Sequence, residues 1–229
     1  MVQTHQVKHR PQLGDEAATY VRALVMSGEL RPGTQVRAES IAEVLGISTT
    51  PAREGLQSLR VEGFLELVPR RGFQVAPLTG QDIRDLFRAQ ALLGGELAYR
   101  AAAKAGAADL VELEALHHEL IAASARRDTG LLEEKNHAFH RLINRLADSR
   151  KLILVHGLTT RYVPRMFYAS IPGWQEATVE DHTEILAALK AGDAAAARRA
   201  MEEHLTRAGE LLAEHFDARG AEGMRRTSA

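Results

Sequence analysis

Apolar residues recur with a helical period along most of the chain, and glycine interrupts the period where one segment gives way to the next. In the first third of the chain this pattern predicts three short helices, over residues 15–27, 37–45 and 46–63. In the last of these, Ala52, Leu56 and Leu59 recur at helical spacing and are expected to pack inward, whereas Arg53 faces away. A helix with a polar outer face therefore follows a short helix and a glycine turn.

Residues 64–78 leave the helical period and form two short apolar runs around a basic turn. The runs 64–67 and 73–75 predict strands, and the turn between them holds Arg70 and Arg71. Two helices joined by a tight turn and followed by a basic hairpin are typical of a winged helix-turn-helix, whose second helix enters the major groove of DNA. The helix alone is equally compatible with an ordinary surface helix, and the basic hairpin favours the DNA-binding interpretation.

The rest of the chain shows helical periodicity without a strand signal. Thr79 and Asp82 form a capping pattern at its start, and helices are predicted over 81–104, 107–126, 129–147, 151–168, 178–191 and 193–217. Short loops between them predict an antiparallel bundle. The expected protein is mainly α, with a flexible arm (1–13), a winged helix-turn-helix with a small β-wing (14–78), an all-helical domain (79–220) for effector and metal binding and dimerisation, and a flexible tail (221–229).

Composition and charge limit the function classes. A chain of 229 residues is long enough for two domains, and 45% hydrophobic with 26% charged residues is typical of a soluble globular protein. There is no apolar run that could span a membrane, no signal peptide and no cysteine, so we expect a cytoplasmic protein without a membrane partner. The net charge is −1, and residues 1–78 hold nine Lys and Arg against eight Asp and Glu. DNA binding must therefore depend on local placement of arginines.

Three runs of sequence resemble a known family in their order and spacing. They are GELRPGTQV (28–36), AEVLGISTTPAREGLQSLRVEGFLEL (42–67) and PRRGFQV (69–75), and they resemble the winged helix of the GntR family of bacterial transcription regulators. The resemblance implies DNA contacts from the start of each helix and from the wing, at Arg37, Ser48, Thr49, Thr50, Arg53, Arg71 and Gly72. The family usually has an arginine where this chain has Thr49. Because this removes a bidentate guanine contact, the resemblance implies a different preferred operator.

Three of the ten histidines lie on apolar faces of different predicted helices. These are His140, His182 and His204. A single buried histidine is more often a core residue than a ligand, but three that converge inside a bundle form a suitable site for Zn, Ni, Mn or Fe. Asn136 lies one helical turn before His140 and offers an oxygen as a fourth ligand. The pattern therefore predicts a divalent metal as cofactor, with Zn, Ni or Mn as the candidates.

The segments that hold these residues carry a second resemblance. NHAFH (136–140), EDHTEILAAL (180–189) and MEEHL (201–205) resemble the FCD ligand-binding domain of the FadR subfamily of GntR regulators. The resemblance runs from about residue 80 to residue 215. It implies that Asn136, His140, His182 and His204 hold a divalent metal, and that a small carboxylate effector binds on or beside it.

Departures from the family pattern concern both the metal and the effector. Many relatives have an aspartate where this chain has Asn136, which leaves the predicted site more positive. Relatives often carry an arginine and a glutamate where this chain has Gln90 and Gly94, so a carboxylate clamp is lost. Arg161 and Arg165 are one turn apart on a single predicted helix and are candidates to replace that clamp. The candidate effector contacts are therefore Gln90, Arg161 and Arg165, although the two arginines are equally compatible with a solvent-facing pair.

Together these features predict a metabolite-responsive bacterial transcription regulator, with repression as the expected effect. We expect it to bind a pseudo-palindromic operator in double-stranded DNA as a homodimer and to respond to a small organic acid at the metal site. Three alternatives remain open: a direct metal sensor, a metal-dependent helical-bundle hydrolase, and a metal that only stiffens the bundle. No acidic residue stands in catalytic motif spacing with the histidines, so we do not expect an enzyme.

Overall fold

The computed structural model describes residues 13–168 and 171–227, with side chains throughout these ranges except at 165–166 and 219–227. The chain divides into two compact units, Met1–Leu78 and Thr79–Ala229, and the division falls at the boundary that the sequence predicts. Within the described ranges, no helix combines the length and the apolar character that a membrane span requires. The predicted arm at 1–13 lies outside the described residues, apart from Leu13, which begins the first helix.

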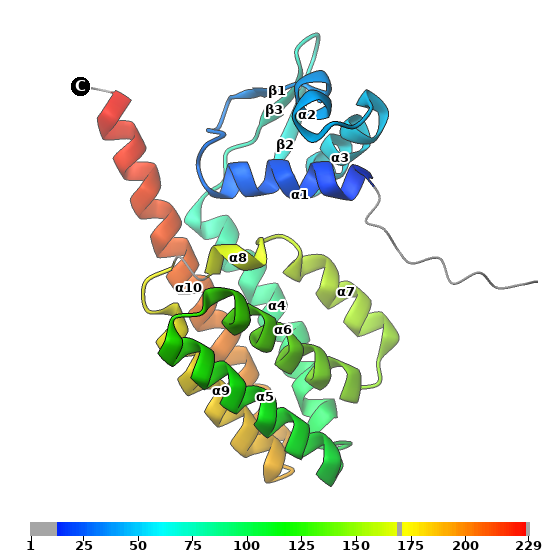
Figure 1. Cartoon of the computed structure of the whole chain (residues 1–229), viewed down its shortest axis with the longest axis vertical. Coiled ribbons are helices and arrows are strands. Elements are labelled where there is room, and N and C mark those ends of the chain that lie inside the picture. The colour runs from blue at the N-terminus through cyan, green and yellow to red at the C-terminus, as the bar shows by residue number, and fades with distance from the viewer. Residues whose placement is uncertain (1–12, 169–170, 228–229) are drawn as a thin grey trace, which may run out of the picture. The chain divides into compact units, whose positions relative to one another are not determined.

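The first unit contains three helices and a small antiparallel sheet (Figure 1). In chain order its elements are α1 (Leu13–Met26), β1 (Gln35–Val36), α2 (Ala38–Leu45), α3 (Thr49–Val61), β2 (Leu65–Val68) and β3 (Gly72–Val75). The strand order is β1–β3–β2, with Leu65 opposite Val75 and Val68 opposite Gly72. The predicted helices and hairpin are confirmed. The sequence pattern does not predict β1, because two residues are too short to show a strand period and pair only through β3.

The sequence predicts that Ser48 caps α3 with its side-chain oxygen, and the start of the helix differs from this prediction. Ser48 occupies the N-cap position in an extended conformation, but its side chain makes no capping hydrogen bond. An N-cap oxygen accepts from the backbone N–H two or three residues into the helix, and here the third position is Pro51, which has no N–H. The prediction of a side-chain cap at Ser48 was therefore wrong. The inward positions of Ala52, Leu56 and Leu59 are confirmed, since all three are fully buried.

Helices α1 and α3 approach each other closely at Gly55. A Cβ atom at this position would lie 2.5 Å from the carbonyl oxygen of Gly14 and 2.9 Å from Cβ of Ala17. Both distances are shorter than van der Waals contact, and the first neighbour is backbone, which cannot rotate away. The absence of a side chain at Gly55 therefore determines how closely the recognition helix α3 packs on α1.

All the described secondary structure of the second unit is helical (Figure 1). Its elements are α4 (Gly80–Ala102), α5 (Ala107–Arg126), α6 (Thr129–Leu146), α7 (Arg150–Thr160), α8 (Arg165–Tyr168), α9 (Trp174–Lys190) and α10 (Ala194–Thr227). The predicted capping pattern is confirmed, because the backbone N–H of Asp82 donates to Thr79 Oγ1 at 3.2 Å and that of Thr79 donates to Asp82 Oδ2 at 2.8 Å.

Several helix bounds differ from the predicted ones. The single helix predicted over 151–168 is divided into α7 and α8, because Pro164 has no N–H and disfavours helical backbone in the residue before it. Helix α9 begins at Trp174 rather than at residue 178. Helix α10 continues to Thr227, so residues 221–227 extend the last helix where a flexible tail was predicted.

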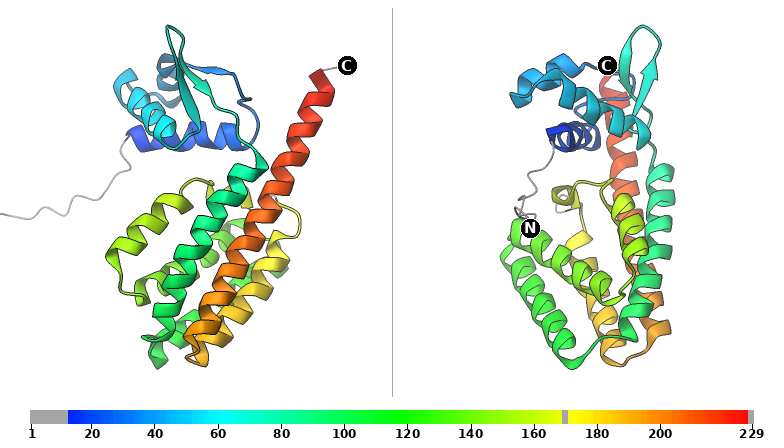
Figure 2. Two further views of the ribbon diagram at one scale, coloured as in Figure 1. Left: turned by 180° about the vertical axis from the view of Figure 1, so that it is seen from behind. Right: turned by 90° about the vertical axis from the view of Figure 1, so that its right-hand side faces the viewer.

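Helices α4 and α10 lie side by side and run antiparallel, as the views in Figures 1 and 2 agree. Glycines allow this close packing. A Cβ at Gly209 of α10 would collide with Phe87 of α4, and one at Gly94 of α4 would lie 2.6 Å from Cδ1 of Leu205. At the end of the pair, the backbone N–H of Gly80 donates to Asp217 Oδ1 at 3.0 Å.

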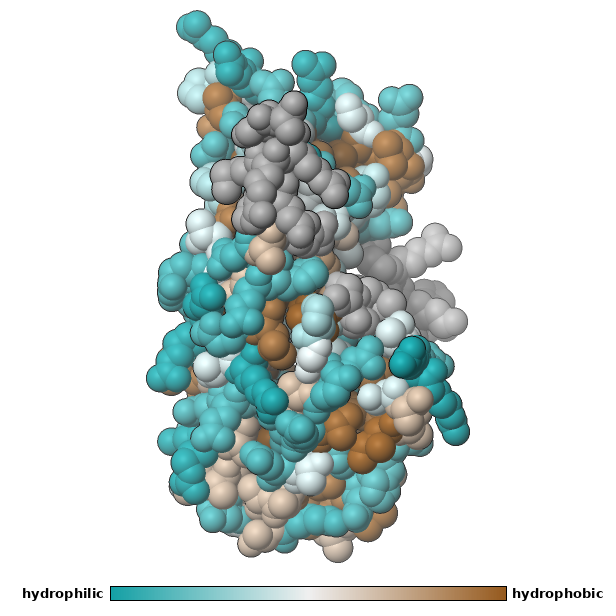
Figure 3. Space-filling view, turned by 90° about the vertical axis from the view of Figure 1, so that its left-hand side faces the viewer, coloured by the Kyte–Doolittle hydropathy of each residue, from teal (hydrophilic) through white to brown (hydrophobic). Residues whose placement is uncertain are grey.

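Helices α5, α6 and α9 enclose an apolar core against this pair. It includes Leu113 of α5, Phe139 and Ile143 of α6, and Ile185 of α9, all fully buried. On the face of the helical unit drawn in Figure 3, hydrophilic side chains predominate and hydrophobic ones form smaller areas between them. The polar outer surface and apolar interior are what the helical period of the sequence predicts.

Substitution of Gly55 by alanine is expected to destabilise the first unit by roughly 1–3 kcal/mol, because the added methyl group must push α3 away from α1. Denaturant unfolding measured by circular dichroism checks this. Ser58→Ala, on the exposed face of the same helix, is the control and is expected to change the stability little. An unchanged unfolding midpoint for Gly55→Ala would show that the contact between α1 and α3 is not tight.

Candidate DNA-contacting surface and metal centre

An open groove of about 1130 Å³ in the first unit collects the predicted DNA contacts. Its walls are the start of α2, the outer face of α3 and the β2–β3 hairpin. Six of the seven predicted residues line it, namely Arg37, Thr49, Thr50, Arg53, Arg71 and Gly72. The seventh, Ser48, is exposed at the N-cap of α3, directly before Thr49. Residues from three separate segments therefore present one exposed surface of the kind that a helix-turn-helix offers to DNA.

Of the other residues that line the groove, Gln57 and Arg70 carry groups that can donate hydrogen bonds to DNA. Gln57 follows Arg53 by one helical turn, and that spacing is the signal that would have included it among the predicted contacts. Arg70 stands at the hairpin tip with a positive φ of 65°. The sequence places both Arg70 and Arg71 in the basic turn of the hairpin, and both line the groove.

Charge in this groove differs from the average of the unit. Four arginines line it against Glu39 and Glu54. The Arg53 guanidinium lies 3.7 Å from a carboxylate oxygen of Glu39, and both side chains are more than half exposed. An exposed ion pair of this length is weak, so Arg53 remains available to a phosphate or a base. The local excess of arginine accounts for how a nearly neutral unit presents a cationic surface.

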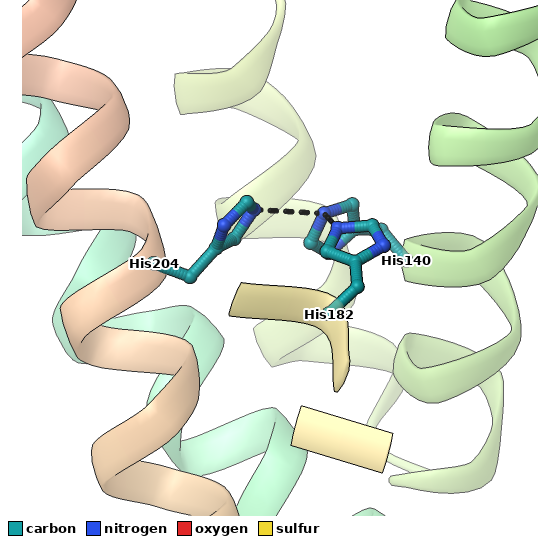
Figure 4. A group of neighbouring side chains, drawn as sticks. All are labelled: His140, His182 and His204. Carbon is teal, nitrogen blue, oxygen red and sulfur yellow. Dashed lines mark hydrogen bonds between the residues drawn. The ribbon is translucent and has the colours of Figure 1, made fainter. Parts of the chain in front are cut away.

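In the second unit, three imidazoles from three different helices point toward one another (Figure 4). The Nε2 atom of His140 on α6 lies 3.2 Å from Nε2 of His182 on α9 and 3.2 Å from Nε2 of His204 on α10. His182 and His204 are buried, and His140 is partly buried. The structure therefore brings together the three histidines that the sequence analysis selected.

Burial keeps two of these imidazoles neutral. It lowers the pKa of His140 and of His182 well below the ordinary range, and the nearness of the other histidines lowers each pKa further. A neutral imidazole has a free lone pair on one ring nitrogen, which is the form that binds a metal. At neutral pH the cluster is therefore in a state suited to ligation.

The positions of the ligand atoms fit a divalent cation. Nitrogen atoms about 2.0–2.1 Å from a tetrahedral zinc ion lie about 3.3–3.4 Å from one another, close to the two 3.2 Å separations seen here. Asn136 lies one turn before His140 on α6, and its buried Oδ1 atom has no hydrogen-bond partner among the residues that the structure describes. A buried oxygen without a donor is costly unless a ligand satisfies it. The residues present are therefore suited to hold Zn²⁺, Ni²⁺ or Mn²⁺.

Asp181, which the sequence analysis did not select, contacts this cluster from its outer side. Its Oδ2 atom lies 3.1 Å from Nδ1 of His204, and its Oδ1 accepts from the Arg207 guanidinium at 3.1 Å. Burial alone raises the pKa of Asp181, but the hydrogen bond with His204 and the charge of Arg207 outweigh it and lower the pKa. The position of Asp181 directly before His182 in the sequence gave no sign that it reaches the histidine of another helix.

The three predicted effector contacts belong to three segments of the second unit, namely α4, the end of α7 and α8. Gln90 is buried and its amide donates to the backbone oxygen of Thr159 at 3.2 Å. Arg161 is exposed at the end of α7. The side chain of Arg165 lies outside the described part of the chain, and its backbone belongs to α8. The prediction that Arg161 and Arg165 stand one turn apart on a single helix was wrong, because Pro164 separates α7 from α8.

His156 of α7 is a further buried polar residue beside the cluster. Its Nε2 atom has no hydrogen-bond partner and lies 3.5 Å from the position that a Cβ of Gly94 would take. Burial lowers the pKa of His156 to about 4, so the ring is neutral at physiological pH. The sequence leaves His156 ambiguous, because the face of α7 that turns inward depends on how α7 packs against α4.

Comparison with known protein families assigns both units. The profile of the FCD domain matches residues 85–207, and the profile described as bacterial regulatory proteins, gntR family, matches residues 13–75. The first match includes all four predicted metal ligands, and the second includes every predicted DNA contact. The chain therefore belongs to the GntR family of bacterial regulatory proteins and carries an FCD domain.

Individual relatives agree with this assignment. The chain is 26% identical over 219 residues to the HTH-type transcriptional regulator LutR of Bacillus subtilis. The aligned region covers 85% of this chain and 98% of LutR. It is 29% identical over 181 residues to the Glc operon transcriptional activator of Escherichia coli, over 71% of each chain. The solved structure of E. coli McbR/YncC shares the fold, with a TM-score of 0.68 over 90% of this chain and 24% identity. The protein is a DNA-binding transcriptional regulator and not an enzyme.

Arg53→Ala is expected to abolish operator binding without lowering stability, because the Arg53 side chain is exposed in the groove and contributes nothing to the core. DNA fragments selected by the wild-type chain from bacterial genomic DNA serve as probe in a mobility-shift assay. Arg60→Ala is the matched control, since Arg60 is an exposed arginine of the same helix that does not line the groove. Equal loss of binding in both variants, or a large fall in melting temperature for Arg53→Ala, would contradict the assignment.

Proposed function

We propose that the protein is a metabolite-responsive repressor that binds a pseudo-palindromic operator as a homodimer. In this proposal a small carboxylate regulates it from a divalent-metal site formed by Asn136, His140, His182 and His204. The observation that carries the proposal is the convergence of three imidazole nitrogens from three helices. Asn136, one helical turn before His140, adds a buried oxygen without a hydrogen-bond partner among the described residues. The metal and the effector are inferences from that arrangement.

The charge of the ligand set supports an anionic effector. As ligands, three imidazoles and one amide bring no negative charge, so a divalent cation bound there would leave the site with a local charge of +2. When bound, the cation supplies Lewis-acid coordination to a carboxylate oxygen. The protein's own groups add direction: His156 is neutral and its Nε2 has no partner, so it is available for a hydrogen bond to a polar group of the effector.

A bundle whose helices are joined at one ligand site provides a means of regulation. The ligands come from α6, α9 and α10, so an effector that binds one arrangement of these helices better than another shifts their populations. A difference of about 5.5 kcal/mol between the two states is enough to move the equilibrium from 1:99 to 99:1. We propose that this shift changes how freely the winged helices of a dimer engage two half-sites.

Repression is the simpler direction of control, because a protein bound at an operator blocks transcription without any further contact. Activation requires an additional surface for the polymerase. The Glc operon relative is named an activator, which makes activation the alternative. A reporter gene behind the operator distinguishes them: removal of the regulator raises expression under repression and lowers it under activation.

Exposed apolar side chains on α4 and α7 support a dimer formed by the second unit. Leu154, Val155 and Leu158 are 57%, 45% and 53% exposed on α7, and Leu92 of the adjoining α4 is 53% exposed. Large apolar side chains gathered on neighbouring helices are typical of an interaction surface. In such a dimer each winged helix would contact one half-site, so the total contact with the operator would double.

Light scattering is expected to give twice the 25.1 kDa mass of one chain. The double substitution Leu154→Asp and Leu158→Asp places two charges in the proposed interface and is expected to yield a folded monomer. Val111→Asp, at a residue 67% exposed on α5, is the matched control and is expected to leave the dimer intact. A dimer that persists in the double variant would place the interface elsewhere.

Metal analysis of the purified wild-type chain, before and after reloading with Zn²⁺, Ni²⁺ or Mn²⁺, tests the ligand site directly. We expect near-stoichiometric metal in the wild type and none in His140→Ala/His204→Ala. His118→Ala, which removes an exposed histidine, is the control and is expected to retain the metal. If the wild type fails to bind any of the three metals, the histidines are core residues and the proposed site is wrong.

The metal-loaded chain then serves to identify the effector class. Small carboxylates are expected to raise its melting temperature and to change its operator affinity, with neither effect in the double histidine variant. Two other outcomes favour the alternatives. Operator affinity that follows metal concentration and ignores carboxylates indicates a direct metal sensor. A metal that raises stability and changes no DNA affinity indicates a structural ion.

A further inference from the structure

Asp181 links a surface arginine to one of the buried histidines. It belongs to α9 and precedes His182, yet its carboxylate contacts His204 of α10, with 3.1 Å between Oδ2 and Nδ1. The side chain of Asp181 is 13% exposed and that of His204 is 5% exposed, so little water competes for this hydrogen bond. The other carboxylate oxygen of Asp181 accepts from Arg207 at 3.1 Å.

This contact determines which ring nitrogen of His204 carries the proton. A carboxylate paired with arginine is an acceptor only, so Nδ1 of His204 must donate to it. In the neutral ring, which is the form that binds a metal, the lone pair then resides on Nε2, and Nε2 is the atom that lies 3.2 Å from Nε2 of His140. A hydrogen bond to the outer nitrogen of a ligating histidine holds the ring in place and makes the inner nitrogen more basic.

The same contact brings a negative charge next to a ligand set that has none. Asn136 and the three imidazoles carry no negative charge, and the desolvation of a divalent cation by ligands without negative charge is costly. The Asp181 carboxylate is one imidazole ring away from the cluster. Its charge is therefore close enough to stabilise a cation there while leaving the coordination positions free.

We propose that Asp181 is a positioning residue of the metal site, which orients His204 and supplies through it the negative charge that Asn136 does not bring. The inference rests on the proposed metal site. It assigns to this chain a fifth residue that governs metal affinity without touching the metal. The Arg207 side chain holds Asp181 from the solvent side and completes the arrangement.

The test measures the Zn²⁺ affinity of the metal-free full chain by competition with a chromophoric chelator. Asp181→Asn keeps the size of the side chain and removes its charge, and we expect affinity about 10–100-fold weaker than that of the wild type. Glu180→Gln is the matched control. Glu180 precedes Asp181 on the same helix and binds the same Arg207 at 3.2 Å, but in the described structure it makes no contact with His204. The Zn²⁺ affinity of the Glu180→Gln variant is expected to equal that of the wild type.

A second substitution separates a charge effect from a fold defect. Asn136→Asp places the missing charge on a ligand itself, and its gain in Zn²⁺ affinity is expected to be larger in the Asp181→Asn background than in the wild type. An equal gain in both backgrounds would overturn the charge role. Thermal unfolding of the metal-free variants reports the fold: a lower melting temperature with unchanged Zn²⁺ affinity would make Asp181 structural and overturn the proposal.

The Zn²⁺ measurements distinguish an error in the role of Asp181 from an error in the metal site itself. If the wild-type chain binds Zn²⁺ and Asp181→Asn binds it equally well, the positioning role is wrong and the metal site stands. If the wild-type chain binds no Zn²⁺ at all, the metal site is wrong, and the role of Asp181 falls with it.

Discussion

The close antiparallel packing of α4 against α10 is the contact on which the second unit depends. Glycines at the crossing points, such as Gly94 and Gly209, let the two backbones approach where side chains would collide. Dispersion and hydrophobic burial increase with such close contact over a long helix pair. The pair then forms the support for the shorter helices, and His204 on α10 is held at a fixed depth from which it meets residues of α6 and α9.

The histidine cluster is costly unless something binds to it. Three imidazoles and the Asn136 oxygen are taken from water, and their hydrogen-bond capacity is only partly used by one another. A purely structural core would gain more from apolar side chains of the same size. Buried groups of this kind are frequent at functional sites, and the proposed binding site would account for the cluster where packing alone does not.

The DNA-binding unit must present positive charge to DNA although its net charge is small. Its overall charge is almost neutral, and the arginines that line the groove come from α2, α3 and the hairpin tip. The positive φ at Arg70 turns the hairpin so that neighbouring arginines both line the groove. Local concentration of charge therefore replaces net charge, and this favours binding that depends on correct docking over general attraction to DNA.

The sequence by itself determined the helices, the hairpin, the division into two units and the three histidines, because each of these leaves a local period or motif. It did not determine β1 or the inward face that buries His156, since these depend on partners distant in the chain. The separation of α7 from α8 was missed although Pro164 is a local signal for it. Asp181 is the clearest example of a contact that the sequence does not reveal. Its neighbour His182 marks the site, but only the packing of α9 on α10 brings its carboxylate to His204, because hydrogen bonds between helices depend on a register that no local pattern records.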